Sequence, residues 1–123
     1  MPARNICIVD DDSAVRESLR MMLERAGHAV RCFASGPIFL SQGDVSQCGC
    51  LVLNQTMPEM TGLALLELLK ARGTPCPTIL MTGGNAEELA AKAVCLGAMA
   101  VLEKPLGAKE LLPWIERAMA ASA

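Results

Sequence analysis

The sequence has almost no aromatic residues: two phenylalanines, one tryptophan and no tyrosine among 123 residues. The core of this chain must therefore be built from aliphatic side chains, mainly leucine, valine, isoleucine, alanine and methionine. With 52% hydrophobic residues, the composition supports a well-buried globular fold and argues against a disordered chain. The length suits one hydrophobic core, so we expect a single domain over residues 1–123.

Other absences exclude whole classes of function. The formal net charge is only −2, so the composition offers no basic surface for nucleic acid or for an anionic membrane. No apolar run approaches the roughly 18 residues that a membrane-spanning helix needs. The N-terminal segment lacks the pattern of a signal peptide. We therefore expect a cytoplasmic protein whose domain contacts neither nucleic acid nor a membrane.

Cysteine is present, but without a metal-binding pattern. Cys48-Gly-Cys50 is the only close pair, and no second Cys/His pair follows at a spacing typical of zinc sites. We interpret the cysteines as small buried apolar residues, with metal or redox use as the alternative. Cys48 and Cys76 fall in predicted loops and are the thiols expected to be exposed. The other four fall in predicted strands or helices: Cys7, Cys32, Cys50 and Cys95.

Short apolar runs alternate with stretches of helical periodicity along the whole chain. Strands are predicted at 6–9, 29–33, 50–53, 78–81 and 98–102. Helices are predicted at 13–26, 37–42, 63–71, 85–96 and 109–120, with Ser13 and Asn85 as N-caps and a polar loop at 43–49. Arg31 interrupts the second strand and favours a place at the sheet edge. Strands that alternate with helices indicate an α/β fold, a parallel sheet with helices on both faces.

Polar residues follow the predicted strands, where a parallel sheet places its functional crevice. Asp10-Asp11-Asp12 follows the first strand, and Thr82 and Lys104 follow the last two. Carboxylates a few ångströms apart repel by about 4 kcal/mol at an effective dielectric near 20, so a cation must compensate them. Asp10 and Asp11 suit Mg²⁺, while Thr82 and Lys104 suit phosphoryl oxygens. Asp12 is better explained by the start of the following helix.

Four segments at these spacings resemble response-regulator receiver domains, which are CheY-like. The segments are Ile-Val-Asp-Asp-Asp, Met-Pro-Glu-Met-Thr-Gly, Met-Thr-Gly-Gly and Glu-Lys-Pro. Receivers of the FixJ/NarL type are the closest match, and the resemblance covers essentially the whole chain. It implies a flavodoxin-like (βα)5 fold with a five-stranded parallel sheet of order 2-1-3-4-5. It also implies a place in two-component signalling, within a phosphorelay.

The resemblance also assigns roles to individual positions. It implies that Asp10 and Asp11 form the acidic pair, and that Thr82 and Lys104 contact phosphoryl oxygens. The peptide bond between Lys104 and Pro105 is implied to be cis.

The position of the phosphoryl-accepting aspartate is occupied by Asn54. In the family, Mg²⁺ binds the second acid of the pair, the acceptor and the main-chain carbonyl two residues later. These ligands correspond to Asp11, Asn54 and Thr56, with Asp10 acting through water. An amide is a poor nucleophile that cannot form the acyl phosphate, and it removes one anionic ligand. We therefore predict no phosphorylation and a weakened Mg²⁺ site.

A second departure lies on the fifth strand. Val101 stands where the family has an aromatic ring that moves with the hydroxyl residue on activation. Both departures favour a phosphorylation-independent regulator, a pseudo-receiver that is not an enzyme and that binds a histidine kinase or another signalling protein. A homodimer is left open. One alternative is an ordinary receiver that carries an engineered Asp-to-Asn substitution or is truncated from a longer regulator. Another is a small phosphatase or phosphotransferase.

Three large side chains are candidates for partner contacts. Trp114 lies on the last predicted helix, where it could be a half-buried ring over the sheet edge or an interface anchor. Met57 and Met60 lie in the loop after the third strand, where they could contact a partner or pack within the loop.

Overall fold

A computed structural model describes residues 4–122 of the chain. The remaining residues of the predicted domain, 1–3 and 123, lie outside the described part. The strands are β1 (Asn5–Val9), β2 (Val30–Phe33), β3 (Cys48–Asn54), β4 (Thr78–Thr82) and β5 (Ala98–Glu103). The helices are α1 (Ser13–Arg25), α2 (Gly36–Gln42), α3 (Gly62–Ala71), α4 (Ala86–Cys95) and α5 (Ala108–Ser122), with a 3₁₀ turn η1 (Val45–Gln47).

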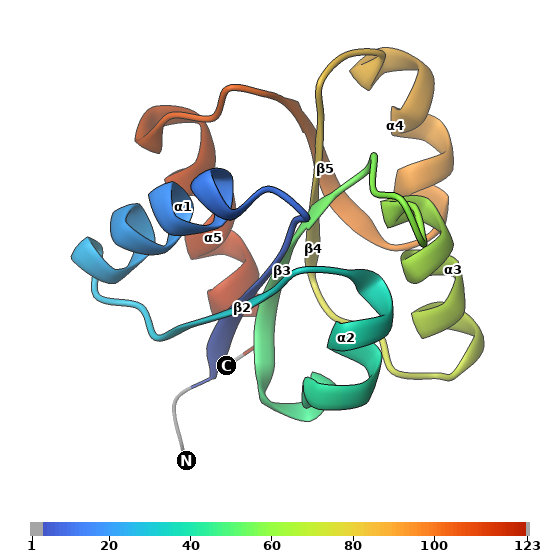
Figure 1. The fold of residues 1–123 in the computed structure, drawn as a ribbon, viewed down its shortest axis with the longest axis horizontal. Helices are drawn as coiled ribbons and strands as arrows, with labels where there is room; N and C mark the ends of the chain where they lie inside the picture. Colours follow the sequence, from blue (N-terminus) through green and yellow to red (C-terminus); the bar gives the residue numbers. More distant parts are fainter. Residues whose placement is uncertain (1–3, 123) are drawn as a thin grey trace.

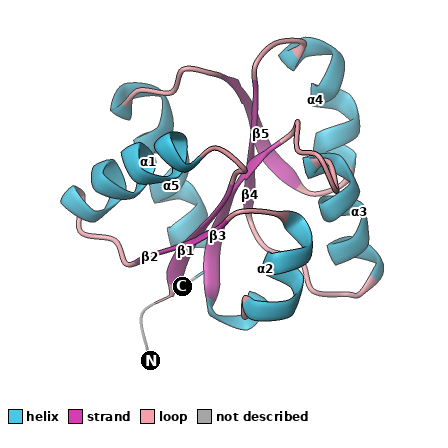
Figure 2. Cartoon of the chain, in the orientation of Figure 1, coloured by secondary structure: helices cyan, strands magenta, loops and turns pink. Residues whose placement is uncertain are grey.

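All five strands are parallel and lie in the order β2-β1-β3-β4-β5, which confirms the predicted fold class. Helices cover both faces of the sheet: α1 and α5 lie on one side, and α2, α3 and α4 on the other (Figure 1). The strand carrying Arg31 is an edge strand, as its composition predicted. Figure 2 shows the three central strands enclosed between the two helical layers.

Two aliphatic clusters, one on each face of the sheet, form the core. Alternate residues of β3 divide between them: Leu51 and Leu53 point toward α2, α3 and α4, whereas Val52 points toward α1 and α5. All seven residues of β3 are buried, as expected for the central strand of a sheet that is covered on both faces. Phe33 and Phe39 pack edge to face within the first cluster, with ring centroids 5.2 Å apart.

Of the two predicted N-caps, Ser13 was wrong and Asn85 is correct in position. The N-cap of α1 is Asp12, whose carboxylate accepts hydrogen bonds from the backbone N–H groups of Ala14 and Val15. Ser13 is instead the first residue of the helix. Asn85 occupies the N-cap position of α4, but its left-handed backbone (φ 63°) leaves the side chain without a capping hydrogen bond.

The predicted loop at 43–49 was also wrong at its end. It contains the 3₁₀ turn, and Cys48 and Gly49 already belong to β3. Cys48 pairs with Asn5 of β1 across a register shift, so strand pairing rather than local composition extends β3 backward. Cys48 and Cys76 are both buried, which contradicts the expectation that they are exposed; Cys95 is the exposed thiol.

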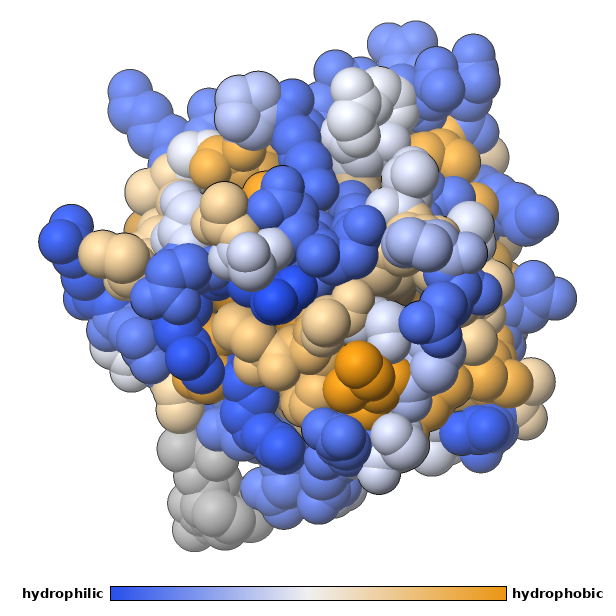
Figure 3. Space-filling model, viewed as in Figure 1, coloured by the Kyte–Doolittle hydropathy of each residue, from blue (hydrophilic) through white to orange (hydrophobic). Residues whose placement is uncertain are grey.

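The face of the molecule seen in Figure 3 is polar for the most part, with smaller apolar areas. In the view of Figure 3, hydrophilic residues dominate the periphery, and an apolar area lies near α2. Large apolar side chains that are exposed include Met21, Ile38 and Val94. No helix within residues 4–122 is long and apolar enough to cross a membrane.

Candidate functional site

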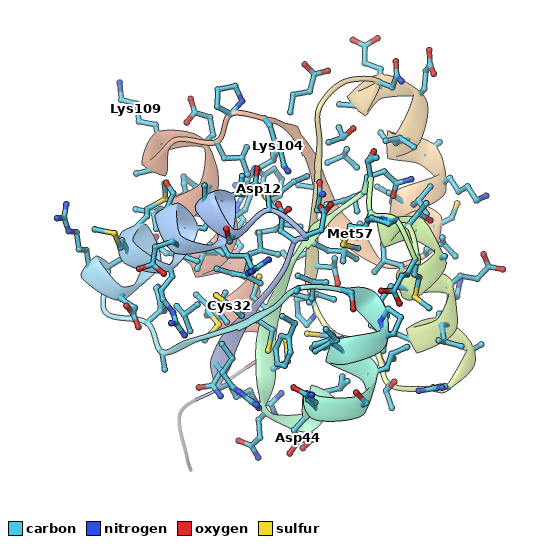
Figure 4. The ribbon with its side chains drawn as sticks, viewed as in Figure 1. Asp12, Cys32, Asp44, Met57, Lys104 and Lys109 are labelled. Atoms are coloured by element: carbon cyan, nitrogen blue, oxygen red, sulfur yellow. The ribbon has the colours of Figure 1, made fainter. Side chains whose placement is uncertain are left out.

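The carboxyl ends of the central strands bring the predicted site residues together. Asp10 follows β1 directly, Asn54 ends β3 and Thr82 ends β4, so three adjacent strands contribute one side chain each. Lys104 follows β5 and reaches back across the end of β4. Figure 4 labels Lys104 after β5, Asp12 at the start of α1 and Met57 in the loop after β3.

Asp10 is the buried charge at the centre of the site, with no exposed surface. Its Oδ2 accepts a salt bridge from Lys104 Nζ at 2.9 Å, and its Oδ1 accepts the backbone N–H of Asp12 at 2.9 Å. The two bonds hold the carboxylate from both sides, as a buried ion needs. Lys104 therefore pairs with Asp10, the first residue of the acidic pair.

Asn54 is also buried, and its amide nitrogen faces three oxygen atoms. Nδ2 donates to the Thr56 carbonyl oxygen at 2.8 Å, and it lies 3.3 Å from Asp11 Oδ1 and 3.4 Å from Asp10 Oδ1. Carboxylates and carbonyls only accept hydrogen bonds, so the NH₂ group, and not the amide oxygen, must face them. The amide therefore joins the two carboxylates and the loop after β3 in one network.

This arrangement does not fit a metal ion. The oxygens that the resemblance assigns to Mg²⁺, those of Asp11 and Thr56, already accept hydrogen bonds from Asn54 Nδ2. An NH₂ group cannot be a ligand, so the amide would have to turn over and break these bonds before its oxygen could face a cation. Two carboxylates and Lys104 leave a net charge of about −1, so the donor amide and the ammonium together take the place of a cation.

Thr82 lies at the same end of the sheet but outside this network. It is buried, and its hydroxyl donates to the carbonyl oxygen of Gly84 and accepts the Gly84 N–H at 3.3 Å. The backbone N–H of Lys104 donates to the Thr82 carbonyl at 2.8 Å, which fixes the end of β5 against β4. The peptide bond between Lys104 and Pro105 is cis, as the resemblance implied.

Val101 lies on β5, which two strands, β3 and β4, separate from β1 and the acidic pair. It is partly buried on β5 and packs against the core cluster on the side of α2, α3 and α4. Among the other candidates, Met57 is buried and Met60 partly buried in that same cluster, which supports packing within the loop. Trp114 is partly buried against the opposite cluster, with the Arg117 guanidinium 5.0 Å from the ring centroid.

Two further residues hold the site, and the sequence analysis did not identify them. Arg16 in α1 donates from Nη1 to the main-chain oxygen of Asp10 at 2.6 Å. Gln55 accepts the backbone N–H of Leu63 through its side-chain oxygen at 2.9 Å, which ties the start of α3 to the end of β3. Neither residue carried a distinctive signal, because an arginine on a polar helix face and a glutamine in a loop are ordinary in sequence.

The geometry agrees with the comparison to known families. Residues 6–116 match the family described as the response regulator receiver domain. The chain is a receiver domain of this family. Its relatives include the response regulator protein TodT of Pseudomonas putida, 40% identical over 114 residues that cover 93% of this chain and 50% of TodT. The transcriptional regulatory protein FixJ of Bradyrhizobium diazoefficiens is 38% identical over 115 residues, covering 94% of this chain and 56% of FixJ.

Solved receiver structures share the fold. The crystal structure titled FixJ-N superposes with a TM-score of 0.86 at 36% identity, covering 98% of this chain and 96% of that one. The response regulator StyR gives a TM-score of 0.91 at 35% identity, covering 98% of this chain and 61% of StyR. The receiver domain described here therefore spans about half the length of the curated relatives that it matches.

Proposed function

We propose that this receiver domain works as a phosphorylation-independent protein-interaction module of two-component signalling, and that it is not an enzyme. The observation that carries the proposal is the amide of Asn54, which bonds to Thr56 and to the acidic pair where a receiver would hold its acceptor carboxylate. An amide at this position offers no nucleophilic oxygen for an acyl phosphate.

The charge balance of the pocket supports the same proposal. Lys104 pairs with Asp10, and the Asn54 amide donates toward Asp11, so neither carboxylate depends on a metal ion for compensation. We propose that Asp11, Asn54 and Thr56 bind Mg²⁺ weakly at best, and that Thr82 and Lys104 occupy phosphoryl-contact positions that receive no phosphoryl group. The proposed partner is a histidine kinase or another signalling protein, in the cytoplasm, with a homodimer as one form of contact.

A second candidate is an ordinary phosphorelay receiver whose acceptor aspartate was replaced by Asn54. It is favoured by the pocket residues that the chain keeps: Asp10, Asp11, Thr82 and Lys104 all stand at the strand ends. Val101 argues against it, because a receiver that switches through an aromatic ring on β5 has none here to move. The two candidates differ in what happens when the aspartate is restored.

The experiment is phosphorylation by a small-molecule donor, read by intact mass. The Asn54 protein and Asn54→Asp are incubated with acetyl phosphate in Mg²⁺, and any added phosphoryl group is tested for the lability of an acyl phosphate. We expect no acyl phosphate on the Asn54 protein and a labile single addition on Asn54→Asp, which shows that donor and fold are competent. A stoichiometric, labile phosphoryl group on the Asn54 protein would refute the proposal. A minor base-stable product on Thr56 or Thr82 would not.

A further inference from the structure

A cluster of cysteines lies at the end of the sheet opposite the candidate site. Cys48 begins β3, and Cys76 lies two residues before β4 begins. Their sulfur atoms are 3.1 Å apart, and Cys76 Sγ also lies 3.3 Å from the main-chain oxygen of Cys48. Cys7 of β1 also forms a side-chain hydrogen bond with Cys48. Two thiols on neighbouring chain segments thus meet sulfur to sulfur without a bond between them.

Cys48 and its neighbour Cys50 are held in their protonated form. The hydrogen bond with Cys7 lowers the pKa of Cys48, but the hydrogen bond with Cys76 and burial outweigh it, so the pKa is raised above the ordinary value. Burial likewise raises the pKa of Cys50. Because the thiolate is the reacting form, these sulfurs should react slowly at neutral pH unless a neighbour captures an intermediate. Within residues 4–122, no three His, Cys, Asp or Glu side chains are arranged to hold a metal ion, which leaves pairing as the chemistry.

Of the two buried cysteines Cys48 and Cys76, Cys76 lies nearer the surface. A groove of about 250 Å³ lies between α3 and α4, and Cys76 forms part of its wall together with Leu69 and the exposed Cys95. Cys76 is 7% exposed and Cys48 only 2%, so a reagent in the groove meets Cys76 first, with Cys48 behind it. Lys70 also lines the groove, and its positive charge favours an anionic reagent such as oxidised glutathione.

We propose that Cys48 and Cys76 are a reversible disulfide site, formed by exchange with a small disulfide that enters this groove. Cys76 sulfur attacks one sulfur of the reagent, the reagent's S–S bond breaks, and the first thiol leaves with the proton of Cys76. Cys48 sulfur then attacks Cys76 sulfur, and the second thiol leaves with the proton of Cys48. The protein loses two electrons and two protons, and the reagent, reduced to two thiols, gains them.

The disulfide would be a local cross-link between the starts of two central strands. It encloses residues 48–76, which include β3, the loop after it and α3. The proposal does not rest on the proposed function, because the pair lies at the opposite end of β3 from Asn54. A reducing compartment would keep the pair open, which is typical of redox-responsive thiols and not of structural disulfides.

The test is oxidation of the whole chain by oxidised glutathione, read by intact mass and by tryptic mapping under denaturing, thiol-blocked conditions. We expect a loss of about 2 Da, the mass of two hydrogens. Two of the six cysteines should no longer react with the thiol-blocking reagent. Trypsin cleaves after Arg31, Lys70, Arg72 and Lys92, so the cross-link should join the fragments 32–70 and 73–92. Fragmentation of the joined pair should place the bond on Cys48, and dithiothreitol should reverse it.

Variants give the matched comparison. Cys48→Ser and Cys76→Ser should lose the 2 Da change, whereas Cys95→Ser, which alters the exposed thiol in the same groove, should keep it. A cross-link from Cys7 to Cys48, or a glutathione adduct on Cys95 as the only product, would overturn the proposal. The proposal would also be overturned if every thiol still reacted with the blocking reagent after prolonged oxidation of the folded protein. Mapping of the unsubstituted chain decides the question even where a serine variant fails to fold.

Discussion

The replacement Asn54→Asp should turn a pocket that is stable without metal into one that needs it. The new carboxylate oxygen would stand where Nδ2 now lies, 3.4 Å from Asp10 Oδ1 and 3.3 Å from Asp11 Oδ1. Each such contact between charges costs about 5 kcal/mol at an effective dielectric near 20. Solvent around the exposed Asp11 screens its repulsion with the new carboxylate. The ammonium of Lys104 offsets part of the repulsion between the new carboxylate and Asp10. The new group can also take up a proton, which limits the cost at pH 7 to about 4 kcal/mol.

We therefore expect Asn54→Asp to lower the free energy of unfolding by about 2 to 4 kcal/mol in EDTA at pH 7. Crowding by Asp10 and Asp11 raises the pKa of the new carboxyl in the folded state, so the folded form binds protons more tightly than the unfolded form. Stability in EDTA should consequently fall as pH rises from about 4 toward that raised pKa. Added Mg²⁺ should restore about 2.7 kcal/mol at one hundred times its Kd.

The assay is urea unfolding in EDTA and in Mg²⁺, with Gln47→Glu as the matched control. Gln47 is exposed in the 3₁₀ turn at the opposite end of β3, so this change makes the same amide-to-carboxylate exchange away from the pocket. The Asn54 protein and Gln47→Glu should unfold at nearly the same urea concentration in both buffers. Equal stabilisation of the Asn54 protein and Asn54→Asp by Mg²⁺ would refute the reasoning, because the amide would then not replace the cation.

Three further substitutions test the contacts around the site, each by urea unfolding. Lys104→Met leaves the buried carboxylate of Asp10 without its ammonium partner. Because the lysine side chain is 25% exposed, we expect the free energy of unfolding to fall by about 2 kcal/mol, less than for a fully buried pair. Asp12→Ala removes the N-cap of α1 and should cost about 1 kcal/mol. Gly62→Ala would place a Cβ 2.6 Å from Leu80 Cδ1 and 2.8 Å from the Asn54 carbonyl oxygen, and should cost about 1 to 3 kcal/mol. Gly83→Ala, where nothing lies within 4 Å of the added Cβ, should change little.

The strands were predictable because short apolar runs are well separated along the chain, and the strand order followed from the family resemblance. Residues 6–9 and 79–81 are apolar on both faces, and both segments belong to buried strands in the structure. The start of β3 was not predictable, because Gln47-Cys48-Gly49 has the local composition of a turn. Its place in the sheet comes from pairing with β1, a contact between segments about forty residues apart that local periodicity does not contain.

The candidate site was predictable in its members and less so in its contacts. The strand-end rule and the resemblance placed Asp10, Asn54 and Lys104 together, and the structure joins them in one network. The direction of the Asn54 amide depends on three acceptors from separate segments, so no single motif encodes it. Arg16 was missed for a similar reason, since its bond to the Asp10 carbonyl depends on how α1 packs against the sheet.

The final prediction concerns switching, and it separates the two candidate functions. In Asn54→Asp, a beryllofluoride mimic of the phosphoryl group could draw the Thr82 hydroxyl from its bond with Gly84. A ligand shifts a conformational equilibrium only by its differential interaction with the two states, and Val101 offers no ring to repack when Thr82 moves. We expect amide NMR shifts confined to residues near Asp10, position 54, Thr82 and Lys104. Large shifts across residues 94–101, away from Lys104, or a change in sedimentation, would instead identify an ordinary receiver that Asn54 silences.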